Sequence, residues 1–488
     1  PALYRLNTER KYVCGTDRKV RQWTYGRRDR SKKNKVILMV GETGAGKTTM
    51  INTMINYLLG VKFEDQEFYQ ITEEEKHQDQ SQSQTSEITV YEAFVEENPT
   101  SLTIIDTPGY GHTEGYEKDR EIAENLTRLF SAEDGIHYID AVCFVMKASQ
   151  NRLSDKEHYI FHSVLSLFGR DIENNIVFIL TQSDGGPPTD ALNAINTAEI
   201  PCRRDERGKP VHFLFNNQQK EKRVKRYNQG LRSAWEMGEE SMDEFFKLLE
   251  EKNRKSVEMT LDVLIERRQL EAFVSNLKDR IDEKESQMNE LTQIQEALRQ
   301  NRDKIKKFER VFKKKVPIVN EWRWNRKATC CSVCEENCHE WNCDWVSPNN
   351  LSQCSVMSNR HCTVCSGKCH HSKHVKEDKK YVTKTKIVTM RFDELQQEYE
   401  RAEEQLKSDL EKIKEEKSLL LCEAYISIVS LSKIALKADS AFTLQYLDFL
   451  IPRLKEEGKD EWMKNLEDLR KAGEERKNKG ALRFTGKK

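Results

Sequence analysis

Residues 41–49 read GETGAGKTT and directly follow the apolar run VILMV of residues 36–40. An apolar strand, the pattern G-x-x-x-x-G-K-T and then a helical stretch form the context in which a phosphate-binding loop occurs. Because glycine has no Cβ, such a loop can close its backbone N–H groups around phosphate oxygens. The amine of Lys47 would bind the outer phosphates, and the hydroxyl of Thr48 would bind Mg²⁺. The sequence therefore predicts a nucleoside triphosphate site formed by Gly41, Glu42, Thr43, Gly44, Ala45, Gly46, Lys47, Thr48 and Thr49.

A second apolar run, residues 101–105, ends in Asp106 and continues through Thr-Pro to Gly109. An acidic side chain at the end of the strand beside a phosphate loop holds Mg²⁺ through water, and a glycine N–H there contacts the γ-phosphate. We therefore expect Asp106 at the magnesium ion and Gly109 at the γ-phosphate.

Between these two motifs, residues 64–87 form a long polar run without apolar periodicity. Such a run is longer than an ordinary connection and is typical of a loop that orders around a ligand. A threonine in this loop would close over Mg²⁺ and the γ-phosphate. We predict Thr85 for this role, with Thr89 as the alternative, because residues 88–95 read as the next strand.

The apolar run of residues 175–181 leads into the sequence TQSD at residues 181–184. In guanine-nucleotide proteins an [N/T]-K-x-D element stands at this place, and its aspartate accepts hydrogen bonds from the N1–H and the exocyclic amine of guanine. Adenine does not present this pair of donors, so Asp184 would discriminate between the two bases. Thr181 begins the element, and Gln182 replaces the lysine that usually packs over the base.

A further strand, residues 211–215, ends in Asn216 and Asn217, which would contact the base carbonyl. Strands alternate with helical stretches over this region, and that order favours a mainly parallel sheet with helices on both faces. In such sheets the ligand binds at the carboxyl ends of the strands. We therefore expect an α/β nucleotide-binding domain over residues 34–250, preceded by a basic segment at residues 1–33.

The series GETGAGKT, Thr85, DTPG, TQSD and FNN resembles the GTPases of the septin and immunity-associated (GIMAP) branch. The chain as a whole is similar to long vertebrate, especially fish, proteins in which a G domain precedes a coiled coil and a Cys-rich segment. The resemblance implies GTP or GDP with Mg²⁺, and self-association through the G domain. Catalysis would rest on Lys47, Thr48, Thr85 and Gly109.

One departure from the common GTPase pattern predicts slow hydrolysis. Many small GTPases carry a water-orienting glutamine after the D-x-x-G element, but this chain has Tyr110. We expect intrinsic turnover on the order of 10⁻³ per second or below unless a partner or a second subunit supplies the missing group. His112 is a candidate for that group, although a solvent-facing histidine is the simpler interpretation.

Beyond the nucleotide domain, apolar side chains recur every seven residues in two runs. The first predicts a coiled-coil helix over residues 255–316 and the second a returning helix over residues 391–417, which favours an antiparallel hairpin. A parallel coiled coil between two chains is the alternative. Residues 418–475 predict C-terminal helices, and residues 476–488 a flexible tail. The heptad positions are Leu270, Leu277, Leu291, Leu298, Ile305 and Phe312, then Phe392, Tyr399, Leu406, Ile413 and Leu420.

The segment between the two helices, residues 317–390, contains the pattern C-[ST]-V-C-x-x-x-C-H twice. The C-x-x-C spacing is typical of zinc ligands, and in a reducing compartment such a cluster more often holds metal than disulfides. We predict a tip with about two structural zinc ions, and free or disulfide-linked thiols are the alternative. The predicted ligands are Cys331, Cys334, Cys338, His339, Cys362, Cys365, Cys369 and His370, and further candidates are Cys330, Cys343, Cys354, His361, His371 and His374.

The flanks of this tip, residues 315–324 and 381–390, alternate like strands and predict a paired ribbon. Four tryptophans would give so small a unit a core, or a face for an unknown protein partner. They are Trp322, Trp324, Trp341 and Trp345.

The chain has 488 residues, with 81 basic and 81 acidic side chains. Its length predicts two or three domains, and its balanced charge gives no reason to predict a nucleic acid or membrane partner. The basic residues from Arg18 to Lys35 read as a solvated linker, with a phosphate- or lipid-binding arm as the alternative. No signal peptide is visible, and residues 419–438 carry too much charge for a bilayer span. We therefore expect a cytoplasmic protein.

Together these patterns favour a GTP-binding switch, a slow GTPase that couples its nucleotide state and self-association to a helical arm with a zinc tip. A scaffold with a constitutively bound nucleotide is one alternative. An ATP-dependent mechanical protein with a metal-tipped coiled coil is another, and Asp184 argues against it.

Overall fold

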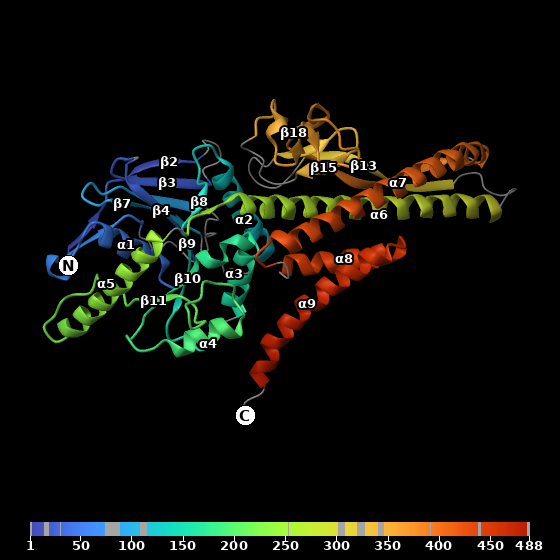
Figure 1. Cartoon of the computed structure of the whole chain (residues 1–488). Helices are drawn as coiled ribbons and strands as arrows, with labels where there is room; N and C mark the ends of the chain where they lie inside the picture. The colour runs from blue at the N-terminus through green and yellow to red at the C-terminus, as the bar shows by residue number, and fades with distance from the viewer. Residues whose placement is uncertain are drawn as a thin grey trace. The chain divides into compact units, whose positions relative to one another are not determined.

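The computed structural model divides the chain into two compact units (Figure 1). Unit 1 comprises Pro1–Leu264, Ile434–Ala441 and Lys471–Lys488, and unit 2 comprises Ile265–Lys433 and Phe442–Arg470. The structure describes residues 2–13, 19–29, 31–73, 88–107, 115–153, 155–251, 253–300, 308–319, 327–339, 346–390, 392–437 and 441–485.

A single large sheet forms the centre of unit 1. Among the described residues its eight strands lie in the order β11-β10-β9-β4-β7-β6-β3-β2. All neighbours are parallel except the pairs β6–β7 and β2–β3. The mainly parallel sheet predicted for this region is thus confirmed. The strands are β2 (Glu9–Tyr12), β3 (Val20–Tyr25), β4 (Lys33–Gly41), β6 (Ile88–Ala93), β7 (Thr100–Asp106), β9 (Ala141–Lys147), β10 (Ile176–Thr181) and β11 (His212–Leu214).

Helices cover both faces of this sheet, as predicted. Successive side chains of a strand point to opposite faces, so Met39 of β4 packs in one core cluster and Val40 in the other. The first cluster includes side chains of α1 and α5, and the second includes side chains of α2, α3 and α4. The helices are α1 (Lys47–Leu58), α2 (Gly115–Ser131), α3 (Asp155–Leu165), α4 (Thr189–Thr197) and α5 (Asn228–Glu250).

The amino-terminal segment is part of the sheet, so the domain boundary predicted near residue 34 is wrong. Strand β3 pairs in parallel with β6, and β2 pairs with β3. Trp23 of β3 is 5% exposed and packs edge-on against Tyr91 of β6. The carboxylate of the buried Glu92 accepts hydrogen bonds from Gln22 and Thr24. Of the basic residues that suggested a solvated linker, Arg21 lies within β3, and Lys33 and Lys35 lie within β4.

The predicted carboxyl-terminal end of the domain, residue 250, lies too early in the chain. The described parts of unit 1 include two small sheets besides the large one. Strand β1 (Ala2–Arg5) pairs with β5 (Glu67–Gln70), and β12 (Lys255–Ser256) pairs with β8 (Tyr138–Ile139). Leu264 belongs to the same core cluster as Val40. The chain therefore stays with this unit well past α5.

Unit 2 contains most of two long helices, α6 (Glu258–Gln300) and α7 (Phe392–Ile434). The first helix ends at Gln300, so the predicted end near residue 316 is wrong. Residues Phe308–Val319 instead form strand β13, which pairs antiparallel with β19 (Lys379–Met390) in a twelve-residue ribbon. This ribbon confirms the predicted pairing of the flanks but begins earlier than expected, at Phe308. Each strand satisfies the backbone N–H and C=O groups of the other.

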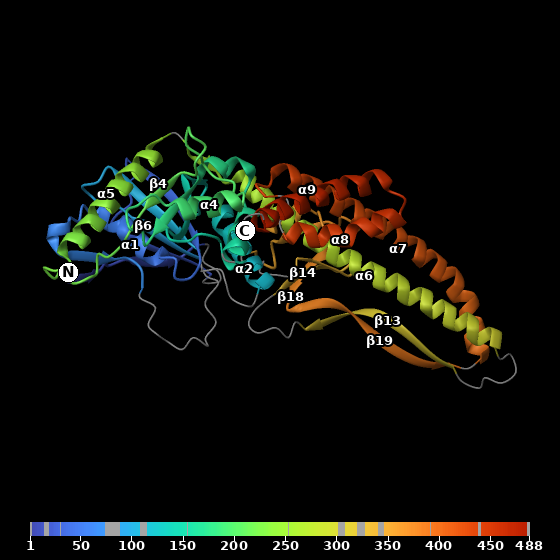
Figure 2. The same cartoon turned by 90° about the horizontal axis from the view of Figure 1, so that it is seen from below.

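The Cys-rich unit lies at the end of this ribbon, and the ribbon runs back alongside α6 (Figure 2). Arg280 of α6 consequently contacts this unit through Glu336. The unit contains the sheet β15-β14-β18 and the pair β16-β17. The predicted residues Cys343, Trp322, Trp324, Trp341 and Trp345 lie outside the described residues. The strands are β14 (Ala328–Cys331), β15 (Glu336–His339), β16 (Met357–Ser358), β17 (His361–Cys362) and β18 (His374–Glu377).

The chain continues after α7 as α8 (Ala441–Glu456) and α9 (Asp460–Thr485), so the tail predicted for residues 476–488 is helical as far as Thr485. Within the described ranges, no helix combines the length and the apolar character that crossing a bilayer requires. Short 3-10 turns complete the described elements: η1 (Phe63–Asp65), η2 (Arg170–Asn175), η3 (Leu351–Gln353) and η4 (His371–Lys373).

The packing of β3 predicts that the amino-terminal strands stabilise the whole of unit 1. Replacing Trp23 by Ala removes a large buried side chain and should lower the free energy of unfolding by about 3–5 kcal/mol. Calorimetry of the full chain measures this effect. The unfolding transition of unit 1 is identified as the one whose temperature rises when GDP is added. Tyr12→Ala on the exposed strand β2 is the control and should change stability by less than about 1 kcal/mol. Equal effects of the two substitutions would contradict this view of β3.

Candidate functional site

The phosphate-binding loop connects β4 to α1 and is held very close to the neighbouring strand β9. A Cβ on Gly41 would lie 2.5 Å from the carbonyl oxygen of Val145, so no other residue fits there without a shift. Gly44 and Gly46 have φ angles of 83° and 101°, a region that favours glycine. Gly46 immediately precedes the first turn of α1, whose free N–H groups are suited to an anion. The local backbone therefore forms the cradle that the sequence predicts.

The side chain of Lys47 folds back over this loop. Its amine donates hydrogen bonds to the carbonyl oxygens of Gly41 at 2.6 Å and Glu42 at 3.3 Å. Lys47 is buried, whereas Thr48 beside it is exposed at the start of α1. This arrangement keeps the ammonium group of Lys47 beside the phosphate-binding loop, where it would neutralise phosphate oxygens.

Thr181 connects the phosphate loop with the loop that was predicted to read the base. Its hydroxyl donates to the carbonyl oxygen of Ala45 at 2.7 Å, and the carbonyl of Met146 lies 3.2 Å away. A Cβ on Gly46 would lie 3.3 Å from the Thr181 side chain. The end of β10 is thus in direct contact with the phosphate loop.

The predicted base-recognition residues lie on two loops that are hydrogen-bonded to each other. The N–H of Ser183 donates to the carbonyl of Phe215 at 3.0 Å. Asp184 is exposed, and one of its oxygens accepts from the N–H of Gly186 at 2.9 Å. Asn217 lies 3.4 Å from the sulfur of Met50 in α1. Asn216 and Asn217 therefore stand beside the TQSD element, as the sequence suggested.

Of the residues predicted to bind Mg²⁺ and the γ-phosphate, the structure describes only part. Asp106 ends β7, next to β4, and the hydroxyl of Thr107 donates to the carbonyl of Met39 at 2.9 Å. Thr89 lies buried inside β6, paired with Asp106 across the antiparallel strands, and is not part of a loop. Thr85, Gly109, Tyr110 and His112 lie outside the described residues.

A parallel sheet with a phosphate loop after its central strand β4 defines the P-loop class of nucleotide-binding proteins. Residues 35–264 match the model of the AIG1 family, so this chain carries an AIG1-family GTPase domain. The match covers the phosphate loop, the TQSD element and the two asparagines. No curated protein matches the chain.

Solved structures with a similar fold include two of Toc33 from Arabidopsis thaliana. The complex with Mg²⁺ and GMPPNP has 13% identity and a TM-score of 0.33, and the match covers 46% of this chain and 88% of Toc33. The complex with GDP and Mg²⁺ has 14% identity and a TM-score of 0.32, and covers 46% and 87%. A bacterial selenocysteine-specific elongation factor has 14% identity and a TM-score of 0.22, and covers 42% and 29%.

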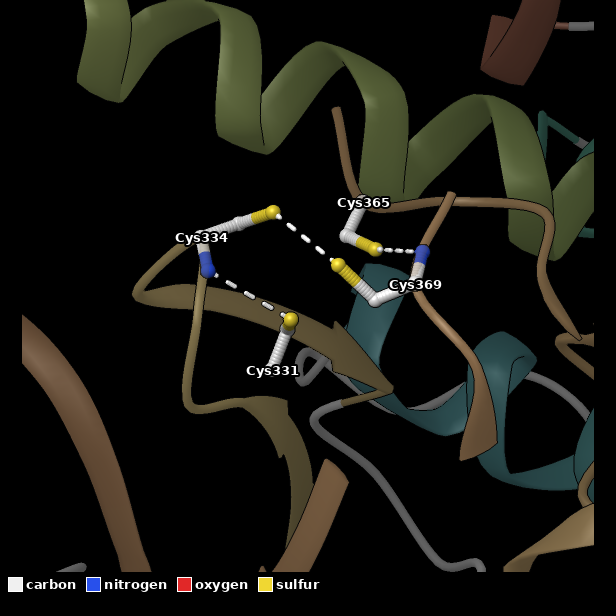
Figure 3. Close-up of side chains that lie close together, drawn as sticks. All are labelled: Cys331, Cys334, Cys365 and Cys369. Carbon is white, nitrogen blue, oxygen red and sulfur yellow. Dashed lines mark hydrogen bonds between the residues drawn. The ribbon is translucent and has the colours of Figure 1, made fainter. Parts of the chain in front are cut away.

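A second candidate site lies in unit 2, where the two copies of the cysteine pattern meet. The ligand atoms of one group lie within 4.8 Å of one another, and its four thiols face one another in Figure 3. A second group of three thiols and one imidazole is equally tight and uses Cys365 again. The groups are Cys331, Cys334, Cys365 and Cys369, and Cys338, Cys362, Cys365 and His374.

Backbone N–H groups point at the sulfurs in both groups. The Cys334 N–H lies 3.4 Å from the sulfur of Cys331, and the Cys365 N–H lies 3.3 Å from the sulfur of Cys362. The sulfur of Cys334 accepts a hydrogen bond from the N–H of Gly367 at 3.3 Å. The sulfur of Cys365 accepts one from the N–H of Cys369 at 3.2 Å. Such donors stabilise negative charge on sulfur, so these turns are built for thiolates.

His374 completes the second group from β18, which pairs with β14. The register places His374 directly opposite Cys331. Its Nδ1 donates to the carbonyl of His370 at 3.3 Å, whereas Nε2 is buried and has no hydrogen-bond partner of ordinary geometry among the described residues. Burial disfavours the imidazolium, but the sulfurs of Cys331 and Cys362 outweigh burial and raise the pKa of His374 to about 10. An imidazole fixed at Nδ1 presents its other nitrogen as a metal ligand.

The two other predicted histidines lie outside both groups. Nδ1 of His339 lies 3.3 Å from the sulfur of Cys354. His370 is only partly buried, and its Nδ1 lies 2.9 Å from the hydroxyl of Ser372. The structure therefore brings six of the eight predicted ligands together and adds His374, which the sequence offered among the further candidates.

The sulfurs are close enough to shift one another's pKa. Hydrogen bonds from Cys334 and Cys365 hold the pKa of Cys331 far below its ordinary value. Burial raises the pKa of Cys338. Thiolates packed within 4.8 Å of one another would repel, and a divalent cation between them would stabilise them together. The Cys₄ and Cys₃His donor sets fit tetrahedral Zn²⁺.

A buried arginine connects this metal-binding candidate to both long helices. Arg280 of α6 is 7% exposed and donates to the carbonyl of Cys334 at 3.0 Å and to Glu336 at 3.0 Å. It also lies 2.9 Å from the carboxylate of Glu416 in α7. The second oxygen of Glu336 accepts from the N–H of Ser366 at 2.8 Å. One guanidinium thus holds the two cysteine loops and the helix pair.

The geometry of the phosphate loop predicts that Lys47→Ala weakens GTP binding. Loss of a charge-assisted hydrogen bond costs about 1.5–3 kcal/mol, so the Kd should rise roughly 10- to 100-fold. Titration with a fluorescent GTP analogue and Mg²⁺ measures this change. Lys62→Ala, beyond the opposite end of α1, is the control and should bind like the unchanged protein. An unaltered Kd for Lys47→Ala would place the nucleotide elsewhere.

Proposed function

We propose that this protein is a guanine-nucleotide switch whose GTPase domain acts on a helical arm carrying a zinc-stabilised tip. The observation that carries the proposal is the contact of Thr181 with Ala45, because it joins the TQSD loop to the phosphate loop. Asp184 would accept the N1–H and amine protons of guanine, Lys47 would neutralise the outer phosphates, and Thr48 and Asp106 would hold Mg²⁺. Asn216 and Asn217 would contact the base carbonyl.

The proposed reaction is slow hydrolysis of GTP to GDP and phosphate. Tyr110 stands where many GTPases have a glutamine that orients water, so the chain lacks that group at this position. Dimerisation through the GTPase domain would supply a replacement from the second subunit. Thr85 and Gly109 are proposed to contact the γ-phosphate and so to distinguish GTP from GDP.

The proposed output is the arm of unit 2. Its long helices α6 and α7 are joined through Arg280 and Glu416, which supports a hairpin within one chain. Structural zinc in the Cys-rich unit would keep the tip folded, and this tip is the proposed contact for a protein partner in the cytoplasm. The role of zinc is to cross-link loops and needs no chemistry at the metal.

Base recognition is tested by Asp184→Asn. The amide of asparagine has an NH₂ donor and an oxygen acceptor where the carboxylate of Asp184 has two oxygen acceptors. Affinity for GTP should therefore fall roughly 100-fold, while affinity for xanthosine triphosphate (XTP) rises. Xanthine carries a carbonyl in place of the exocyclic amine and can accept the new donor. Competition titrations with GTP, XTP and ATP measure the change, with the exposed Asp190→Asn as the control. Equal binding of ATP and GTP by the unchanged protein would remove Asp184 from base recognition.

The switch predicts a nucleotide-dependent change in mass. A non-hydrolysable GTP analogue with Mg²⁺ should double the mass seen by light scattering, and GDP should not. Turnover per subunit should rise with protein concentration from a monomer value on the order of 10⁻³ per second. Monomer turnover near one per second would contradict slow hydrolysis, and a constant mass in all nucleotides would favour a scaffold with a structural nucleotide.

A further inference from the structure

The two metal-ligand groups of unit 2 share one sulfur. Each group has four ligand atoms, but together they contain seven residues because Cys365 belongs to both. Two independent tetrahedral ions need eight protein ligands. The two groups together therefore hold one ligand fewer than two separate sites require.

A thiolate can bind two cations at once because its sulfur has more than one lone pair. We propose that the Cys-rich unit holds a two-zinc cluster in which the Cys365 thiolate bridges both ions. This proposal rests on the structural zinc of the proposed function and specifies how the two ions are held. One ion would bind Cys331, Cys334 and Cys369, and the other would bind Cys338, Cys362 and His374.

The position of Cys365 supports this bridging role. Its side chain is buried, and its sulfur lies within 4.8 Å of the ligand atoms of both groups. It follows Cys362 in a C-x-x-C turn, and it accepts a hydrogen bond from the N–H of Cys369, a ligand of the first group. The bridging sulfur therefore stands between the strand pair β16-β17 and the loop that leads to β18.

A rival ligand for the second ion would be Cys354 or His339, which are 3.3 Å apart. Neither belongs to either group, although both are buried. His339 and Cys354 contact each other through Nδ1 and sulfur. Cys354 is consequently a matched buried cysteine for control experiments.

Sharing of a ligand couples the two ions. Entry of zinc releases the thiol protons of its ligands, so six thiols lose their protons when both ions bind. The first ion fixes Cys365 as a thiolate in the orientation that the second ion requires. Loss of Cys365 would therefore weaken both ions, whereas loss of any other ligand would remove one.

The test measures zinc in the purified full chain, prepared under reducing conditions with zinc present. We expect about two ions per chain in the unchanged protein and in Cys354→Ala, and about one in Cys369→Ser and in His374→Ala. Cys365→Ser should retain less than one. Two ions in the unchanged protein with one in Cys365→Ser would overturn the bridge and leave structural zinc intact. Absence of zinc from the unchanged protein would instead refute the zinc tip itself.

Cobalt provides a second readout, and its main measurement is made on the unchanged protein. Two Co²⁺ ions joined by a thiolate couple magnetically, so the electron paramagnetic resonance intensity per cobalt should fall as the second ion enters the unchanged protein. His374→Ala, with one ion, should keep full intensity per cobalt. Intensity that increases in proportion to cobalt up to two ions would show separate sites and overturn the proposal.

Discussion

The nucleotide unit depends on the close approach of the phosphate loop to the two strands beside it. A side chain at position 41 would collide with the backbone of Val145. A side chain at position 46 would fit only if the side chain of Thr181 moved slightly. The loop is therefore in close contact with β9 and β10, and the TQSD element begins at the end of β10. Because Ala45 accepts a hydrogen bond from Thr181, the phosphate loop and the TQSD element are directly connected. A site fixed in this way needs little reorganisation when the nucleotide binds.

The second unit has a corresponding constraint in Arg280. Three carboxylates, from Glu283, Glu336 and Glu416, surround this one buried guanidinium, and together they raise its pKa against the effect of burial. A buried ion pair of this kind is weak support for stability, but its removal leaves uncompensated charge. We interpret the network as a device that specifies one arrangement of α6, α7 and the cysteine loops. The same guanidinium bonds to the backbone of Cys334, so the order of the helices and that of the metal ligands are connected.

The sequence predicted the nucleotide unit better than its edges because the central strands are continuous apolar runs. Every residue of β10 is buried, and its run of apolar side chains is visible without a structure. Strand β2 has the opposite character, since all four of its residues are exposed and only backbone pairing with β3 makes it a strand. The heptad pattern predicts a helix where strand β13 lies, because the residues of β19 that pair with it lie 60 to 82 residues further along the chain. Patterns of side chains do not reveal such long-range pairing.

The candidate metal ligands show the same limit in a sharper form. The repeated pattern suggested equivalent roles for His339 and His370, but the groups in space are not repeats of each other. One group takes two cysteines from each copy of the pattern, and the other takes Cys338 from the first copy and Cys362 and Cys365 from the second. The last position falls to His374 of β18, a strand that pairs with β14. Ligands interleaved in this manner cannot be divided into two half-units, so each group depends on both copies of the pattern.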